Sequence, residues 1–142
     1  MCNSPAKQNR TFILLTNPFK KRLMEQKYDQ PETAEIEKAK SHIIVEIIEY
    51  VPNAVVIKTI IKKSTGNISI MSFDSGEGLT EKTTPFDTFA QIIEGEAEIV
   101  IDQVSHHLKS GQGIIIPAHL SSFIKPNGRF KMIQTIIKSG YN

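Results

Sequence analysis

The sequence predicts an all-β domain over residues 54–142, preceded by an extension with one or two helices over residues 1–53. Short segments of the larger part alternate apolar and polar residues, as strands with one buried face do. Turns rich in glycine, proline, asparagine and serine separate these segments at regular intervals. Many short strands joined by such turns favour a sandwich or a barrel.

The composition excludes several classes of protein. Hydrophobic residues make up 39% and charged residues 23% of the 142 residues, as is ordinary for a globular domain. A net charge of +2 is too small to indicate nucleic-acid binding. The single cysteine, Cys2, excludes an internal disulfide. No stretch approaches the roughly 20 apolar residues of a membrane span, and no secretion signal is recognisable at the N-terminus. We therefore expect a cytoplasmic protein.

The extension contains two predicted helices. Residues 11–16 are expected to form a short strand, and residues 18–27 a helix, because Asn17 is a good N-cap and Pro18 suits the first helical position. A second helix is predicted between Pro31 and Pro52, where apolar residues from Ile36 to Val51 recur at helical spacing. The β-branched run at residues 43–48 also fits a strand, and we favour the helix. We expect the extension to pack on the barrel.

The strands of the larger part each follow from a local pattern. The first alternates lysines with apolar or hydroxyl side chains, with Lys58 and Lys62 on one face and Val55, Ile57, Thr59 and Ile61 on the other. The further predicted strands are residues 68–73, residues 93–101 bent around a glycine, residues 114–116 and residues 130–138. The run at residues 114–116 is continuously apolar, as in a strand buried on both faces.

Glycines and a proline recur at fixed spacing between residues 76 and 126. Gly76 and Gly95 bracket the first part, and five residues separate Gly111 from Pro117. This stretch resembles the two-motif signature of the cupin superfamily. The first motif runs glycine, five residues, His-x-His, three or four residues, glutamate, six residues, glycine. The second runs glycine, five residues, proline, x, glycine, two residues, histidine, three residues, asparagine. The resemblance covers residues 54–138 and implies a jelly-roll barrel, or double-stranded β-helix.

The resemblance also locates a metal site whose ligands are replaced. In the family, three histidines and one glutamate at these positions bind a divalent metal. This sequence has Lys82, Thr84, Thr88 and Ser122 there. Transition metals in proteins prefer imidazole, carboxylate or thiolate ligands. The resemblance therefore implies the scaffold without its metal site, and we expect no metal and no other cofactor.

The function predicted from this site is binding of a small polar or anionic molecule inside the barrel. Lys82 would supply a charge or hydrogen bonds and the three hydroxyls would orient the ligand. The other candidate pocket residues are Met71, Phe73, Phe89, His119, Phe130 and Met132. We also expect a homodimer, because small cupins commonly pair through their sheets and because the strands at residues 55–61 and 133–137 carry many β-branched residues.

Two alternatives belong to other classes. The first is an enzyme, either a metal-free isomerase or epimerase with His119 as base, or an oxygenase with atypical metal ligands. Lys82 would serve as a base or as a Schiff-base amine only if burial lowers its pKa. His106 and His107 are adjacent, so on a strand they face opposite sides and cannot chelate one metal together. The second alternative is an interaction protein with an inert cavity.

Overall fold

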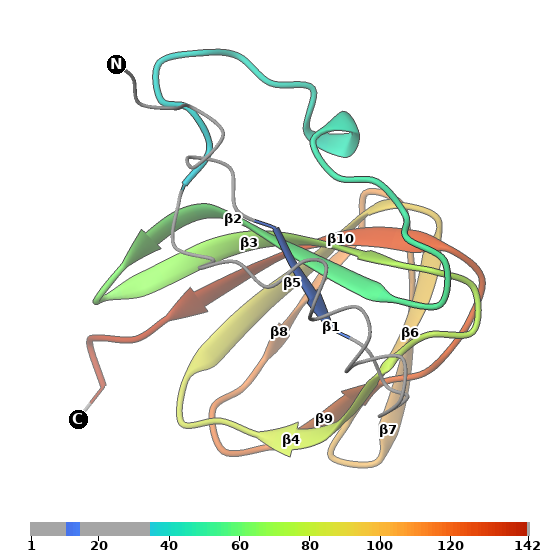
Figure 1. Cartoon of the computed structure of the whole chain (residues 1–142). Helices are drawn as coiled ribbons and strands as arrows, with labels where there is room; N and C mark the ends of the chain where they lie inside the picture. Colours follow the sequence, from blue (N-terminus) through green and yellow to red (C-terminus); the bar gives the residue numbers. More distant parts are fainter. Residues whose placement is uncertain (1–10, 15–34, 142) are drawn as a thin grey trace.

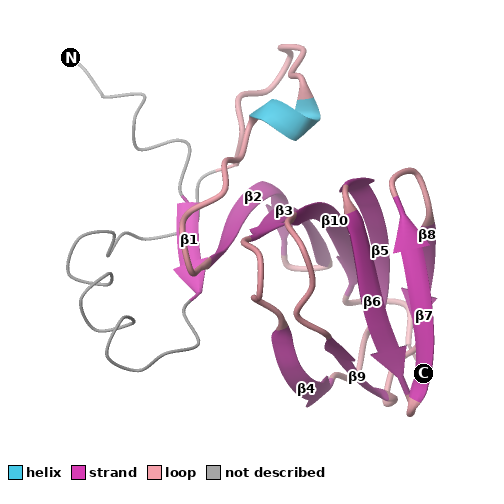
Figure 2. Cartoon of the chain, turned by 90° about the vertical axis from the view of Figure 1, so that its right-hand side faces the viewer, coloured by secondary structure: helices cyan, strands magenta, loops and turns pink. Residues whose placement is uncertain are grey.

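Two antiparallel sheets make up the computed structural model, which describes residues 11–14 and 35–141. The larger sheet has the order β1 (Thr11–Leu14), β2 (Val55–Lys63), β3 (Gly66–Phe73), β10 (Phe130–Ile137), β5 (Asp87–Glu94) and β8 (Gly113–Ile116). The smaller sheet has the order β4 (Leu79–Thr83), β9 (Ser121–Ile124), β6 (Glu96–Ile101) and β7 (Val104–Lys109). The two sheets face each other (Figures 1 and 2). The predicted all-β class is confirmed, and the arrangement is consistent with a cupin barrel.

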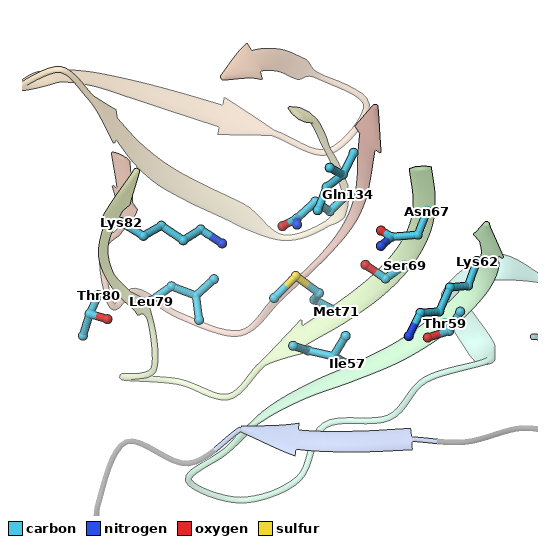
Figure 3. A pocket seen from close by; sticks show the side chains of 11 residues that line it. Ile57, Thr59, Lys62, Asn67, Ser69, Met71, Leu79, Thr80, Lys82 and Gln134 are labelled. Atoms are coloured by element: carbon cyan, nitrogen blue, oxygen red, sulfur yellow. The ribbon is translucent and has the colours of Figure 1, made fainter. Parts of the chain in front are cut away.

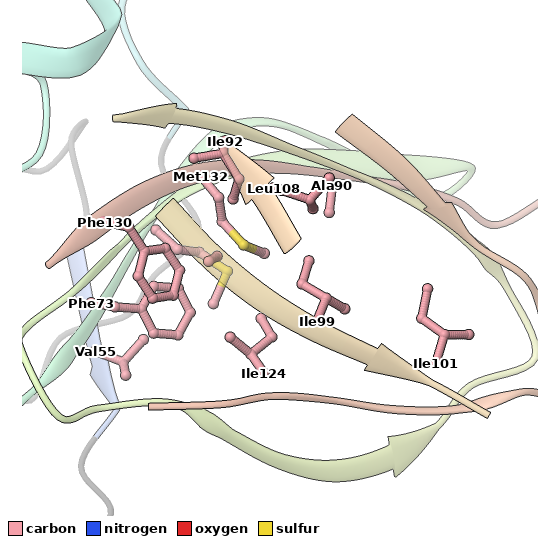
Figure 4. Close-up of a cluster of buried hydrophobic side chains, with 12 residues drawn as sticks. Val55, Phe73, Ala90, Ile92, Ile99, Ile101, Leu108, Ile124, Phe130 and Met132 are labelled. Atoms are coloured by element: carbon pink, nitrogen blue, oxygen red, sulfur yellow. The ribbon is translucent and has the colours of Figure 1, made fainter. Parts of the chain in front are cut away.

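The hydrophobic core fills one end of the space between the sheets. Phe73 on β3 and Phe130 on β10 are cross-strand partners whose rings stack with their centroids 4.3 Å apart. Ile99 and Ile124 of the smaller sheet face this pair from the opposite side (Figure 4). All these side chains come from alternate positions of their strands, so the period-two pattern in the sequence decides which residues enter the core.

The framework glycines occupy turns that require them. Gly76, Gly95 and Gly111 have φ values of 85°, 80° and 92°, in the left-handed region that favours glycine. At Gly95, a Cβ would also lie 2.4 Å from the carbonyl oxygen of Arg129, so even alanine would displace the backbone of that residue. This explains why glycines stand at these points of the sequence pattern.

The second predicted helix is wrong. Over residues 35–53, here called the covering segment, the only helix is a single 3-10 turn, Ile44–Glu46. Ile48 and its neighbours instead pack on the outer face of the larger sheet against Val56 and Ile70. Packing on the barrel was expected, and it is confirmed. β-branched residues lose side-chain freedom in helices, and here they can pack on the apolar surface of the sheet without forming a helix. The other predicted helix, residues 18–27, lies outside the described residues, whereas the predicted strand near residue 11 is present as β1.

Side chains of the sheet replace the hydrogen bonds that a helix would have provided. Lys131, Lys58 and Ser72, from three adjacent strands, donate to the carbonyl oxygens of residues 45, 47 and 49 over 2.5, 3.1 and 2.9 Å. Buried carbonyls need such partners, so these bonds hold the covering segment in its irregular path. No helix in the described ranges is long and apolar enough to cross a membrane.

Candidate functional site

The four residues that the resemblance places at a replaced metal site meet at one cavity. Lys82 on β4 and Ser122 on β9 are cross-strand partners in the smaller sheet. Thr88 lies on β5 of the larger sheet, and Thr84 follows the end of β4. All four line a cavity of about 40 Å³, here called the small cavity. The structure therefore brings together residues that are up to 40 positions apart in the sequence.

Two hydroxyls of this cavity are available to a ligand. Thr88 and Ser122 are buried, with 8% and 6% of their surface exposed. Within the described part of the chain, neither hydroxyl has a hydrogen-bond partner. Every fully buried side-chain N or O atom of the described residues does have a partner, so these two oxygens are not fully enclosed by protein. Thr84 differs, because its hydroxyl donates to the carbonyl oxygen of Phe86 over 3.0 Å and so belongs to a local turn. Buried hydroxyls nearly always have a partner, so Thr88 and Ser122 present sites for water or ligand.

A larger cavity adjoins the small one and shares Lys82 with it. Its volume is about 380 Å³, within the range of roughly 300–1,000 Å³ typical of small-molecule sites. We call it the large cavity. It is lined by Ile57, Thr59 and Lys62 of β2, by Asn67, Ser69 and Met71 of β3, by Leu79, Thr80 and Lys82 of β4, and by Gln134 and Ile136 of β10 (Figure 3). Five of these residues also line the small cavity, namely Leu79, Thr80, Lys82, Gln134 and Ile136.

The strand register explains why this end of the barrel is polar. Thr59, Ser69 and Gln134 are successive cross-strand partners, and so form one row across β2, β3 and β10. The next row toward the core, which includes Ile57 and Met71, is apolar. The inner face of the larger sheet thus changes from apolar to polar along the strands. Apolar walls with a few placed polar groups are typical of ligand sites.

Lys82 has no counter-ion among the described residues. Its side chain extends from β4 toward Gln134 of the facing sheet (Figure 3). The residue is exposed at the open side of the cavities, but the protein around its amine lowers the pKa of Lys82 by desolvation. Two acids near Lys82 in the sequence are engaged elsewhere: Glu81 accepts a hydrogen bond from Ser121, and Asp87 accepts one from the backbone of Ala118 over 2.8 Å.

Lys62 is on the opposite face of β2 from the one predicted. Strict alternation would place it with Lys58, away from the cavities. The pairing of β2 with β3 shifts between Thr59 and Ile61, which is a β-bulge. The extra residue turns Lys62 back to the inner face, where it lines the large cavity with Thr59.

The three aromatic residues that were predicted to line the pocket lie elsewhere. Met71 lines the large cavity and Met132 the small one. Phe73 and Phe130, by contrast, stack in the core and line neither cavity. Phe89 is 42% exposed on the outer face of β5, because its neighbours Thr88 and Ala90 take the inward positions. Gln134 was missed, although its alternation with Phe130 and Met132 in the sequence marks it as inward-facing.

His119 is a turn residue outside both cavities. It occupies the position at which the second motif of the resemblance has glycine, and its φ of 72° is in the left-handed region. Its backbone N–H donates to the carbonyl oxygen of Thr84 over 2.7 Å, and the residue is exposed. The structure therefore gives no support to His119 as a base acting on a ligand in the barrel.

The side chains at the small cavity do not suit a divalent metal. The four positions supply one amine and three hydroxyls, and one of these hydroxyls already donates to a carbonyl oxygen. They supply none of the imidazole, carboxylate or thiolate groups that such ions prefer. Among the described residues, no three His, Cys, Asp or Glu side chains gather at one point. His106 and His107 lie on opposite faces of β7, since they pair with the buried Ile99 and with Glu98 respectively.

Comparison with known proteins supports the fold and the family. No protein-family model and no curated protein sequence matches the chain. Among solved structures, a conserved protein of unknown function from Streptococcus pyogenes is 25% identical, with a TM-score of 0.71 over 75% of this chain and 94% of that one. A cupin superfamily protein from Desulfitobacterium hafniense is 29% identical, with a TM-score of 0.68 over 72% and 94%. An RmlC-like cupin from Shewanella frigidimarina, 16% identical, has a TM-score of 0.62 over 72% and 93% and supports the fold alone. Together with the spacing of the framework glycines, these likenesses show that the chain belongs to the cupin superfamily.

Proposed function

We propose that the protein binds a small anionic molecule in the two cavities beside Lys82, without metal-dependent catalysis at this site. The observation that carries the proposal is the set of three unpartnered polar groups at one place. These are the amine of Lys82 and the hydroxyls of Thr88 and Ser122, none of which has a side-chain partner within the described ranges. A ligand that satisfies all three would recover the hydrogen bonds that the folded chain leaves open.

The charge of the lining favours an acid. The described residues that line the two cavities include Lys62 and Lys82 and no Asp or Glu. Hydrogen bonds from a lysine amine to a carboxylate or phosphate are charge-assisted and stronger than neutral ones. An anion beside Lys82 would also offset the desolvation that disfavours its charged form.

The two cavities suit different parts of one ligand. The small cavity of about 40 Å³ has room for one functional group or a water molecule, and Thr88 and Ser122 supply its hydroxyls. The large cavity of about 380 Å³ has room for the rest of a small molecule, over the apolar Ile57 and Met71 and beside Ser69 and Gln134. We infer that the ligand is an acid with additional hydrogen-bonding groups. We also propose that the protein is cytoplasmic.

Calorimetry with paired small molecules tests this function. Each pair would consist of a carboxylic acid and its uncharged primary amide, so that charge alone differs. We expect the acids to bind more tightly, and Lys82→Met to abolish the difference. Lys109→Met is the matched control, because it removes the same charge from an exposed position of β7 away from the cavities. Equal affinity for acids and amides, or an acid preference that survives Lys82→Met, would overturn the proposal.

The outer face of the larger sheet supports a second proposal, that the chain forms a homodimer. Ile61, Phe89, Ile115 and Ile137 are large apolar residues that are 41%, 42%, 62% and 49% exposed. Ile61, Phe89 and Ile115 lie on one cross-strand row of the outer face, connected through Ile68 and Thr135. Contiguous exposed apolar surface of this kind commonly marks an interface.

A further inference from the structure

We propose that Lys82 forms a reversible imine with a small aldehyde or ketone that enters the large cavity. The inference uses the cavity described above and does not require the natural ligand to be an acid. It adds a covalent activity to a site where only non-covalent binding is proposed.

The local structure of β4 presents the amine to the cavity. The pairing of β4 with β9 is irregular between Leu79 and Lys82, since Leu79 opposes Ile124 and Lys82 opposes Ser122. Four residues of β4, Leu79 to Lys82, thus span three of β9, Ser122 to Ile124, and both Leu79 and Lys82 face inward. From there the side chain, which lines the large cavity, extends toward Gln134 (Figure 3). A small carbonyl compound can approach it without displacing a protein partner.

The surroundings of the amine favour its nucleophilic form. Leu79, Met71 and Ile136 give the cavity apolar walls near Lys82, and desolvation lowers the pKa of the amine. Only the neutral amine attacks a carbonyl, so a lowered pKa raises its fraction at neutral pH. The one other charged residue that the described chain contributes to the lining is Lys62, so the described lining contains no carboxylate that would hold the amine of Lys82 in its charged form. Glu81 and Asp87 make contacts with other groups.

The reaction balances without an oxidant or a reductant. The nitrogen of Lys82 attacks the carbonyl carbon and forms a C–N bond, and a proton passes from nitrogen to the carbonyl oxygen. The C–O bond of the resulting carbinolamine then breaks, and the oxygen leaves as water with the second proton of the nitrogen, so that a C=N bond to Lys82 forms. Ser122, the cross-strand partner of Lys82, and Thr88 offer unpartnered hydroxyls at the adjoining small cavity. These hydroxyls can hydrogen-bond the oxygen as it leaves, and the small cavity has room for a water molecule.

Reductive trapping tests the proposal on the full chain. The protein would be incubated at pH 7 with glycolaldehyde and cyanoborohydride, which converts an imine into a stable secondary amine. Peptide mass spectrometry then gives the rate of modification at each lysine. We expect Lys82 to react several-fold faster than Lys109 and Lys138, which are exposed and lie outside the cavities. Lys82 reacting no faster than these two would overturn the proposal.

Three variants separate this activity from general glycation and from acid binding. Lys82→Arg keeps the charge but cannot form an imine, so the fast phase of trapping should disappear while acids still bind. Lys109→Arg is the matched control and should leave the fast phase unchanged. Ser122→Ala should slow trapping at Lys82 and leave that at Lys138 unchanged. A fast phase that persists in Lys82→Arg would overturn the imine, whereas trapping at Lys82 in a protein that binds no acid would overturn only the proposed function.

Discussion

Lys82 and Ser122 are direct cross-strand partners on β4 and β9, and both side chains face the small cavity. A cationic donor and a buried hydroxyl therefore occupy two positions at which the sequence resemblance places the family's metal-binding histidines. Their pairing in the strand register means that the cupin backbone is retained around a different set of side chains. The consequences of that replacement can be tested at each position.

Restoring the family's ligands should restore metal binding. The variant combines Lys82→His, Thr84→His, Thr88→Glu and Ser122→His, all at residues that line the small cavity. Three imidazoles and a carboxylate suit Zn, Ni or Fe. We expect weak one-to-one binding of Ni or Zn by calorimetry, because partners that orient the ligands are typically worth about 10–100-fold in affinity and are not yet in place.

Single substitutions serve as controls for the restored site. None of the four alone should bind metal measurably, because one new ligand does not make a site. The melting temperature of the combined variant must be recorded, since Thr88→Glu places a carboxylate at a buried position. A folded combined variant with no more affinity for Ni or Zn than the parent would mean that the four side chains do not converge.

Replacing His119 with glycine should stabilise the protein. A non-glycine residue in the left-handed region costs roughly 1–2 kcal/mol, and the greater freedom of glycine in the unfolded chain recovers part of that. We expect a net gain of up to about 1 kcal/mol in the free energy of unfolding, or a few degrees in the melting temperature. His107→Gly, in the strand β7, is the control and should destabilise. Destabilisation by His119→Gly would show that the ring makes contacts which outweigh the strain.

The dimer proposal makes a prediction specific to one face. Light scattering at micromolar concentration should give twice the chain mass for the parent and a single chain mass for Phe89→Lys or Ile115→Lys. Val104→Lys is the matched control, because Val104 is 57% exposed but lies on β7 of the other sheet. A monomeric parent would contradict the proposal, as would a dimer that only Val104→Lys disrupts.

Acid binding should weaken at high pH. Because desolvation lowers the pKa of Lys82 in the free protein, binding of an anion requires the amine to take up a proton once the pH exceeds that pKa. Affinity is therefore full below the lowered pKa and falls as the pH rises through it. The stability of the ligand-free protein should change in the opposite direction. Because the unfolded chain holds this proton more tightly, the charged amine destabilises the folded state, and this destabilisation is relieved as the pH rises. The Lys82→Arg substitution should remove this decline in affinity at high pH, and calorimetry over the same pH range would measure it.

Positions with strong steric requirements were readable from the sequence. Gly95 is required by a left-handed φ and by the backbone of residue 129, so its spacing from Gly76 predicts the turns. The resemblance that includes this spacing implied the four site positions. The alternation that buries Met132 likewise follows from the pleat of a strand. These features depend on local geometry, which a sequence pattern records.

The misassigned residues depend on long-range packing. The apolar residues around Ile48 fit a helix by their spacing, but the sheet supplies both an apolar surface and donors for their carbonyls, which no local pattern contains. Lys62 lines the large cavity because of a bulge in the pairing of β2 with β3, and a bulge leaves no mark in hydrophobic alternation. Phe89 was predicted to line the pocket, but the alternation of β5 places its side chain on the outer face.

The central claim is that the amine of Lys82 is the group that holds an anionic ligand. NMR titration of lysine labelled at the side-chain nitrogen and the adjoining carbon measures the pKa of this amine directly, with Lys82→Arg to assign its signal. In the free protein the pKa of Lys82 should lie below the ordinary value for a lysine, since desolvation disfavours its charged form, and it should rise when a bound acid supplies the missing partner. An ordinary lysine pKa that saturating acid leaves unchanged would contradict the claim.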